Sequence, residues 1–226
     1  LQSLLADPEL RIDGFLLPGH VSAVIGLSAY RFLEECGVPG AIAGFEPVDI
    51  LQGVEWLVER ANARRAECGG GTRAGAGRSP SYPDSFPGGT GGGAAWVRNL
   101  YRRAVRDAGN PAALRLFAEL FAPCDAIWRG IGTIPGSGYA LREAYQGLDA
   151  VVRFGLPPLP PEDPGACQCG RVLKGAILPS ECPLFGRSCT PDHPVGPCMV
   201  SGEGSCAAHY RYAGEVRSER KKGLSD

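Results

Sequence analysis

The chain has 226 residues, 44% of them hydrophobic, which is enough to bury one good core or two small ones. Its 23 basic and 24 acidic residues nearly cancel, so it lacks the strong positive charge of proteins that bind nucleic acid or an acidic membrane surface. It also lacks an apolar run long enough to span a membrane and, over residues 1–20, the pattern of an export signal. We therefore expect a cytoplasmic protein with neither a nucleic acid nor a membrane as partner.

Residues 13–63 are expected to form two strand-to-helix units. The apolar run 14–17 predicts a short buried strand, and apolar residues at helical spacing follow over 21–36. The pattern recurs with a strand over 40–45 and a helix over 48–63, whose apolar residues fall on one face. Strands that alternate with helices are typical of a parallel sheet, so the fold class is α/β.

The middle of the chain begins with an insertion. Residues 64–93 contain runs of glycine with serine, proline and arginine, which predict a flexible segment with no fold of its own. Helical spacing resumes over 94–107 and again from Asn110 to Phe121, and a strand is predicted over 125–134 as a third unit of the sheet. A further helix is predicted near 139–148. We assign residues 1–153 to one α/β domain.

From residue 154 onward the composition changes to proline, glycine and cysteine, which marks a domain boundary. Residues 154–226 have few apolar side chains, so we expect a linker followed by a small loop-rich module that is held together by metal or by disulfides. Six of the nine cysteines of the chain lie there: Cys167, Cys169, Cys182, Cys189, Cys198 and Cys206.

This clustering of thiols favours a bound metal centre. Thiolates are ligands that zinc and iron-sulfur clusters share, and either centre can organise a segment that lacks an adequate core. The irregular intervals, which include Cys-x-Cys, differ from the paired knuckles of most structural zinc sites, and three disulfides fit a reducing compartment poorly. A zinc-stabilised binding module stays open as the alternative, and spacing alone cannot say which four of the six thiols bind a metal.

Six motifs, in the same order along the chain, resemble those of the HypD family of hydrogenase formation proteins. They are Leu17-Pro18-Gly19-His20-Val21-Ser22, Ala43-Gly44-Phe45-Glu46-Pro47, Trp128-Arg129-Gly130-Ile131-Gly132, Ile134-Pro135-Gly136-Ser137-Gly138, Cys182-Pro183-Leu184-Phe185-Gly186 and Glu203-Gly204-Ser205-Cys206-Ala207-Ala208. The resemblance covers nearly the whole chain except residues 64–93, and its last two motifs are highly specific.

The resemblance implies roles for all six clustered cysteines. In HypD-like proteins the tail holds a 4Fe-4S cluster, and the matching ligands are Cys167, Cys182, Cys189 and Cys206. Cys169 and Cys198 match a redox-active pair that can form a disulfide beside the cluster. A cluster passes single electrons and a dithiol stores two, so the two groups suit each other as neighbours.

The resemblance also implies a function, that of a redox-active assembly factor for nickel-iron hydrogenase rather than a stand-alone enzyme. HypD-like proteins work with a HypC-like chaperone as a scaffold for an iron that holds two cyanides and one carbon monoxide, and a HypE-like donor supplies the cyanide. They bind this iron through a cysteine near the start of the full chain, which has no counterpart here. Because the sequence opens at Leu1, we expect a longer protein, and a non-functional fragment is a further alternative.

Four further residues are candidates for lining an iron-binding cleft at the strand ends, where parallel sheets place their ligands. His20 follows the first predicted strand, Glu46 the second, and Arg129 and Ser137 lie near the third. Each has a structural alternative. His20 could support the following helix, Glu46 could favour a helix start, and Arg129 could pair with a carboxylate.

Overall fold

A computed structural model describes residues 1–67, 96–128, 130–157 and 165–222. The chain divides into two compact units, one of Leu1–Pro8 and Ile12–Glu119, the other of Glu9–Arg11 and Leu120–Asp226. Residues 120–153 thus group with the cysteine-rich tail, whereas the sequence pattern placed them with the α/β domain. Each unit has a hydrophobic core of its own.

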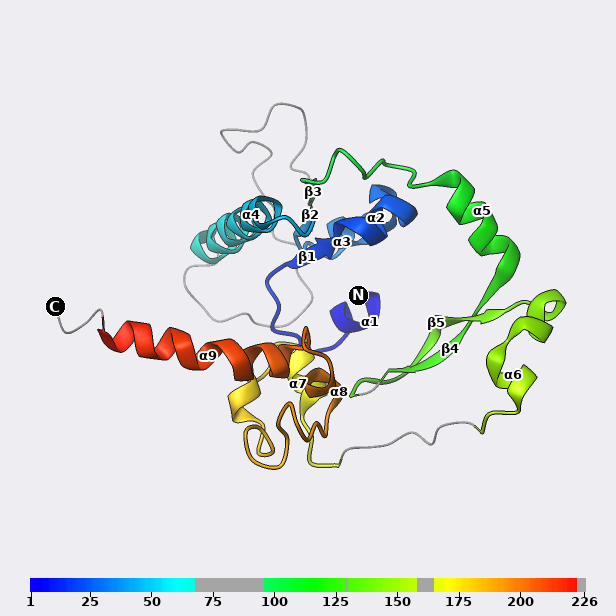
Figure 1. Cartoon of the computed structure of the whole chain (residues 1–226). Coiled ribbons are helices and arrows are strands. Elements are labelled where there is room, and N and C mark those ends of the chain that lie inside the picture. The colour runs from blue at the N-terminus through cyan, green and yellow to red at the C-terminus, as the bar shows by residue number, and fades with distance from the viewer. Residues whose placement is uncertain (68–95, 129, 158–164, 223–226) are drawn as a thin grey trace. The chain divides into compact units, whose positions relative to one another are not determined.

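A three-stranded parallel sheet organises the first unit. Its strands are β1 (Phe15–Pro18), β2 (Gly40–Ala43) and β3 (Val97–Asn99), in the order β1-β2-β3 (Figure 1). The first two strands and the parallel pairing confirm the prediction. The helix predicted over 94–107 is wrong, because β3 occupies its start: the buried central strand β2 needs a second hydrogen-bonded neighbour, and Gly40 N–H donates to Trp96 O at 2.8 Å.

The two faces of this sheet are covered by different helices. Leu17 and Ile42 face a core that also contains Phe15, Tyr30, Leu33, Val38 and Val105. On the other face, α4 (Pro47–Glu67) packs so closely that a side chain at Gly53 would meet Leu16, Ala41 and Ala43. The helix predicted over 48–63 is therefore confirmed, and it continues to Glu67. The rest of the predicted insertion, residues 68–93, lies outside the described part of the chain.

The helix predicted over 21–36 is three shorter elements. They are α2 (Gly19–Ile25), a 3-10 turn at Leu27–Tyr30 and α3 (Phe32–Glu35), and α1 (Gln2–Leu5) precedes the sheet. Gly26, at φ +85°, ends α2 in a backbone conformation that other residues rarely adopt. Near the end of the unit, α5 (Pro111–Leu120) confirms the predicted helix, and the Asn110 side chain accepts hydrogen bonds from Ala112 and Ala113 N–H.

The second unit begins with a β-hairpin instead of the third parallel strand predicted over 125–134. Strands β4 (Phe121–Trp128) and β5 (Gly132–Leu141) pair antiparallel in a separate sheet. The predicted helix over 139–148 is also wrong, because β5 continues to Leu141 and a 3-10 helix follows at Glu143–Leu148. A short turn between two strands leaves no room for the crossover that parallel pairing requires.

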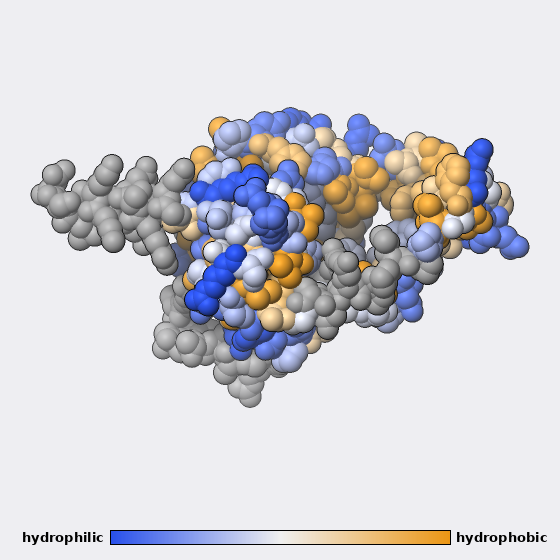
Figure 2. Space-filling view, turned by 60° about the horizontal axis from the view of Figure 1, so that its bottom comes forward, coloured by the Kyte–Doolittle hydropathy of each residue, from blue (hydrophilic) through white to orange (hydrophobic). Residues whose placement is uncertain are grey.

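After the hairpin, α6 (Ala150–Phe154) exposes large hydrophobic side chains. Leu148, Val151, Val152 and Phe154 are each more than half exposed. Hydrophobic surface in the right-hand part of Figure 2 includes this region. None of these residues belongs to either core.

The tail is loop-rich, as predicted. Its helices are α7 (Cys169–Leu173), a 3-10 turn at Pro179–Glu181, α8 (Pro197–Val200) and α9 (Ser205–Lys222). Six of its seven buried core residues are cysteines or neighbours of cysteines along the chain, and the core set is Cys169, Val172, Cys189, Cys198, Met199, Cys206 and Ala207. Among the described residues, no helix is both long enough and apolar enough to cross a membrane.

Candidate metal centre

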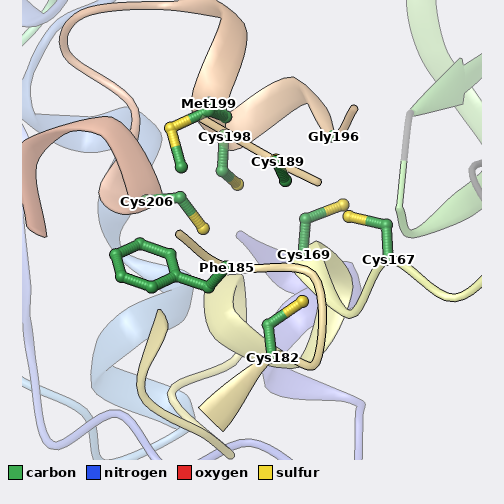
Figure 3. Close-up of a pocket in the computed structure, with 9 residues that line it drawn as sticks. All are labelled: Cys167, Cys169, Cys182, Phe185, Cys189, Gly196, Cys198, Met199 and Cys206. Carbon is green, nitrogen blue, oxygen red and sulfur yellow. The ribbon is translucent and has the colours of Figure 1, made fainter. Parts of the chain in front are cut away.

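All six clustered cysteines line one pocket in the second unit (Figure 3). The pocket has about 260 Å³ of space between its atoms, part of it open to solvent, and Phe185, Gly196 and Met199 complete its lining. The lining therefore offers sulfur and carbon atoms but no charged side chain. Within the described ranges, no three His, Cys, Asp or Glu side chains form a group that could hold a metal ion.

Short helices and tight loops bring these thiols together. Cys167 and Cys169 lie at the start of α7, and Cys182 directly follows the 3-10 turn at Pro179–Glu181. Cys198 and Cys206 lie in the first turns of α8 and α9, while Cys189 bridges back to Phe185. The first turn of each helix thus places a thiol in the pocket, and the loops between the helices bury few other apolar side chains.

Close packing around Cys167 and Cys189 fixes their positions. A side chain on Gly196 would collide with Cys167 Sγ, so the chain can approach this thiol only with glycine. Val195 N–H donates to Cys189 Sγ at 3.4 Å. Hydrogen bonds to ligand sulfurs are one of the ways in which proteins set the potential of an iron-sulfur cluster.

Burial makes the metal-free thiols weak acids. It raises the pKa of Cys167, Cys198 and Cys206 to about 11 each, and neighbouring thiols add to the rise by like-charge repulsion. Burial also raises the pKa of Cys169. At neutral pH and without a metal, Cys167, Cys198 and Cys206 are therefore protonated, and a metal must displace the protons of those that bind it.

The thiols of the pocket interact with one another. Cys169 interacts with both Cys167 and Cys198, and Cys198 also interacts with Cys206. Cys206 in turn interacts electrostatically with Cys167, Cys182, Cys189 and Cys169. All eight cysteines in the part of the chain that the structure describes are free thiols, including the two outside the pocket, Cys36 and Cys124.

A second group of polar residues lies at the carboxyl edge of the parallel sheet in the first unit. His20 follows β1, and its ring stacks on Phe45, which follows β2, with ring centroids 4.8 Å apart. Tyr101 follows β3 and packs where side chains on Gly19 or Gly44 would lie. The structure thus brings His20 and Glu46 to one sheet edge.

Glu46 is part of an ion-pair cluster that the sequence did not reveal. Arg103 Nη2 lies 2.7 Å from Glu46 Oε1 and 2.7 Å from Asp49 Oδ2, and the guanidinium stacks over Tyr101 at 4.2 Å. The hydrogen bond from Arg103 holds the pKa of Asp49 below its ordinary value. Arg103 is half exposed, so solvent screens this cluster in part.

Replacing Asp49 with asparagine is expected to lower the melting temperature at neutral pH, and the loss should shrink in acid. A carboxyl group whose pKa is lowered by folding contributes stability above its ordinary pKa of 3.8, and that stability is lost as pH falls through the lowered value. The melting temperatures of the wild type and D49N should therefore converge as the pH falls below 3.8. The control is D107N at the exposed Arg31–Asp107 pair, which should change little. A D49N deficit that is constant with pH would contradict this role.

The other two cleft candidates are not part of this edge. Ser137 lies in the second unit, where its hydroxyl accepts from Trp128 Nε1 at 2.8 Å and donates to Ile134 O at 2.7 Å. Arg129 lies outside the described residues. The sequence analysis placed these two residues near the end of a third parallel strand. The third parallel strand is instead β3, and Tyr101 and Arg103 are the residues that follow it.

Comparison with known proteins identifies the family. The family model HypD, described as "Hydrogenase formation hypA family", matches residues 1–70 and 90–213. The chain belongs to the HypD family. It is 39% identical to hydrogenase maturation factor HypD2 of Bradyrhizobium diazoefficiens over 100% of this chain and 53% of that protein. It is 41% identical to hydrogenase maturation factor HypD of Escherichia coli over 94% of this chain and 50% of that protein.

The chain spans about half the length of these HypD relatives. The same holds for hydrogenase maturation factor HypD of Cupriavidus necator, which is 39% identical over 92% of this chain and 50% of its own length. The family match includes all six pocket cysteines and leaves out most of the glycine-rich insertion.

Several residues of these two sites were not predicted. Arg103 and Gly196 lie in none of the six motifs, and Phe185 lies within one of them but had no role assigned to it. The contacts that define their roles join segments that are far apart in sequence. A pattern along the chain does not contain that information.

Proposed function

We propose that this HypD-family chain serves in hydrogenase maturation through a 4Fe-4S cluster in its tail, bound by Cys167, Cys182, Cys189 and Cys206. The observation that carries the proposal is the convergence of six cysteines on one pocket that has no other polar side chain in its lining. Soft thiolates are the donor set that iron-sulfur clusters take, so the residues fit the group.

The interactions between the thiols are consistent with one shared centre. Cys206 interacts electrostatically with Cys167, Cys182 and Cys189, and also with Cys169, and all of these thiols line the same pocket. Cys198 interacts with both Cys169 and Cys206. The division into four ligands and one redox pair rests on the resemblance to HypD-like proteins, and the shared pocket supports it by keeping the proposed pair near the proposed ligands.

The pair would act as a two-electron store. Reducing a Cys169–Cys198 disulfide breaks the S–S bond, consumes two electrons and two protons, and gives two thiols. When bound, the cluster would supply or accept these electrons one at a time.

The hydrogenase part of the proposal rests on the names of the relatives, which are hydrogenase maturation factors. We propose the same process here, in the cytoplasm, with an iron that holds two cyanides and one carbon monoxide as the cargo. A HypC-like chaperone and a HypE-like cyanide donor are the proposed partners. His20 and Glu46, at the open edge of the parallel sheet, are the residues of this chain that we propose to contact the cargo.

Metal analysis of anaerobically purified protein tests the cluster. We expect brown protein with about four iron and four sulfide per chain. Thiol trapping before and after reduction tests the pair, and two extra labelled cysteines, Cys169 and Cys198, are expected after reduction. Colourless protein with one tetrahedral thiolate-bound zinc would refute the cluster and favour the alternative of a zinc-stabilised binding module.

A further inference from the structure

The tip of the β-hairpin lies directly against the Cys169 thiol. A Cβ atom on Gly130 would lie 2.5 Å from Cys169 Sγ and 3.1 Å from Gly170 N. From the opposite direction, a Cβ atom on Gly170 would collide with the Gly130 carbonyl oxygen. Figure 3 shows the hairpin ribbon beside Cys167 and Cys169. The two segments touch through a pair of glycines, with no space for a side chain on either.

The local structure of the hairpin explains why Gly130 can make this approach. Ile131 N–H donates to Trp128 O at 3.0 Å and closes a tight turn, in which Gly130 is the third residue with φ +80°. The Trp128 indole bonds to Ser137 across the ribbon and holds the turn to the strands. Gly132, the first residue of β5, has φ +102°, and a Cβ atom added to it would have no other atom within 4 Å. Only one of the two glycines is therefore in contact with the thiol pocket.

Cys169 is placed where a small displacement matters. Its thiol shares the pocket with Cys167 and Cys198 and interacts with both, and Gly130 lies against the sulfur. A disulfide forms only within a narrow range of Cα and Cβ separations, and deviation from that range makes the bond easier to reduce. Whatever limits the position of Cys169 therefore affects whether it pairs with Cys198.

We infer that Gly130 is a positioning residue for Cys169, whose backbone sets the distance of this thiol from Cys198 and so the redox equilibrium of the pair. The inference rests on the proposed role of Cys169 and Cys198. It assigns to the hairpin turn a part in the redox chemistry of the tail, although no side chain of Gly130 takes part. The turn acts by excluding other positions of the sulfur.

The test compares three variants of the full chain in glutathione buffers, where oxidised glutathione and the dithiol exchange to give the disulfide and two reduced glutathiones. Gly130→Ala is expected to shift this equilibrium about tenfold towards the dithiol, which corresponds to about 30 mV. Gly132→Ala introduces the same backbone strain without the contact and should stay close to the wild type. Gly170→Ala places a methyl group at the same contact from α7, at a position whose backbone has no positive φ. It should shift the equilibrium in the same direction as Gly130→Ala. Alkylation and mass spectrometry measure the fraction of free Cys169 and Cys198.

The outcomes separate this inference from the proposed function. If the wild type forms no Cys169–Cys198 disulfide at any glutathione ratio, the proposed dithiol fails and the inference fails with it. If the wild type forms the disulfide but Gly130→Ala and Gly132→Ala behave alike, the contact has no positioning role. If Gly130→Ala does not fold, Gly170→Ala decides the matter, since an unshifted equilibrium in that variant overturns the inference.

Discussion

Replacing Cys206 with serine is expected to abolish assembly of the cluster, whereas replacing Cys198 with serine should leave it intact and remove only the redox pair. The two thiols line the same pocket, are 7% and 6% exposed, and have pKa values raised to about 11 by burial. They are thus matched in burial and acidity and differ in the role proposed for them. A serine hydroxyl is a poor ligand for iron in a cluster, and one lost thiolate leaves an iron without its protein ligand.

Iron and sulfide analysis after anaerobic purification measures the first effect, with about four iron per chain expected for C198S and little for C206S. Thiol trapping measures the second, because C198S should show no disulfide-bonded Cys169. Cys36→Ser, at an exposed thiol of the first unit, is the control for general effects of losing a cysteine. Equal iron in C206S and C198S would show that the four ligands are assigned wrongly.

The sequence predicted those parts of the fold that local patterns determine. Strands β1 and β2 were visible as short apolar runs, and α4 and α5 as apolar residues at helical spacing with a proline at the start. Strand β3 was not visible, because its three residues include an arginine and its strand conformation depends on pairing with β2. Such pairing between residues distant in sequence outweighs local propensity.

The hairpin was missed for a related reason. Its second strand contains Pro135 and three glycines, which weaken any strand signal, and its turn was read as part of a single strand. The hydrogen bond from Gly136 N–H to Asp125 Oδ1 and the Trp128–Ser137 bond hold the ribbon through side chains that a periodicity count does not weigh. The antiparallel pairing therefore became apparent only from the structure.

For the tail, composition was the informative signal. Six thiols in a segment poor in apolar residues predicted a common centre, and the structure brings all six to one pocket. The assignment of individual thiols came from the resemblance, because spacing does not distinguish Cys167 from Cys169. The contact of Cys169 with Gly130 joins residues on opposite sides of the linker, so no pattern along the chain could predict it.

Removing the metal centre is expected to unfold the tail and leave the parallel sheet of the first unit folded. Among the described residues of the tail, the fully buried core apart from cysteines consists of Val172, Met199 and Ala207, with Leu173, Ile177, Leu184 and Phe185 partly buried against it. Burying so few apolar side chains cannot offset the backbone entropy of ordering the segment, which costs about 1–2 kcal/mol per residue. Metal–thiolate bonds can supply the difference, since metal binding to such small modules is coupled to their folding. The first unit has its own core around Leu33 and Ile42, which no thiol helps to build.

Hydrogen exchange measured by mass spectrometry tests this expectation on the full chain, before and after anaerobic treatment with a chelator. Peptides from 167–213 should lose protection after metal removal, whereas peptides from 14–43 should keep it and serve as the internal control. Adding iron and sulfide back should restore protection only in the first set. If protection persists over 167–213 in metal-free protein, the tail folds without a metal. Packing of its apolar side chains and protonated thiols would then be sufficient to hold it, and the expectation would be wrong.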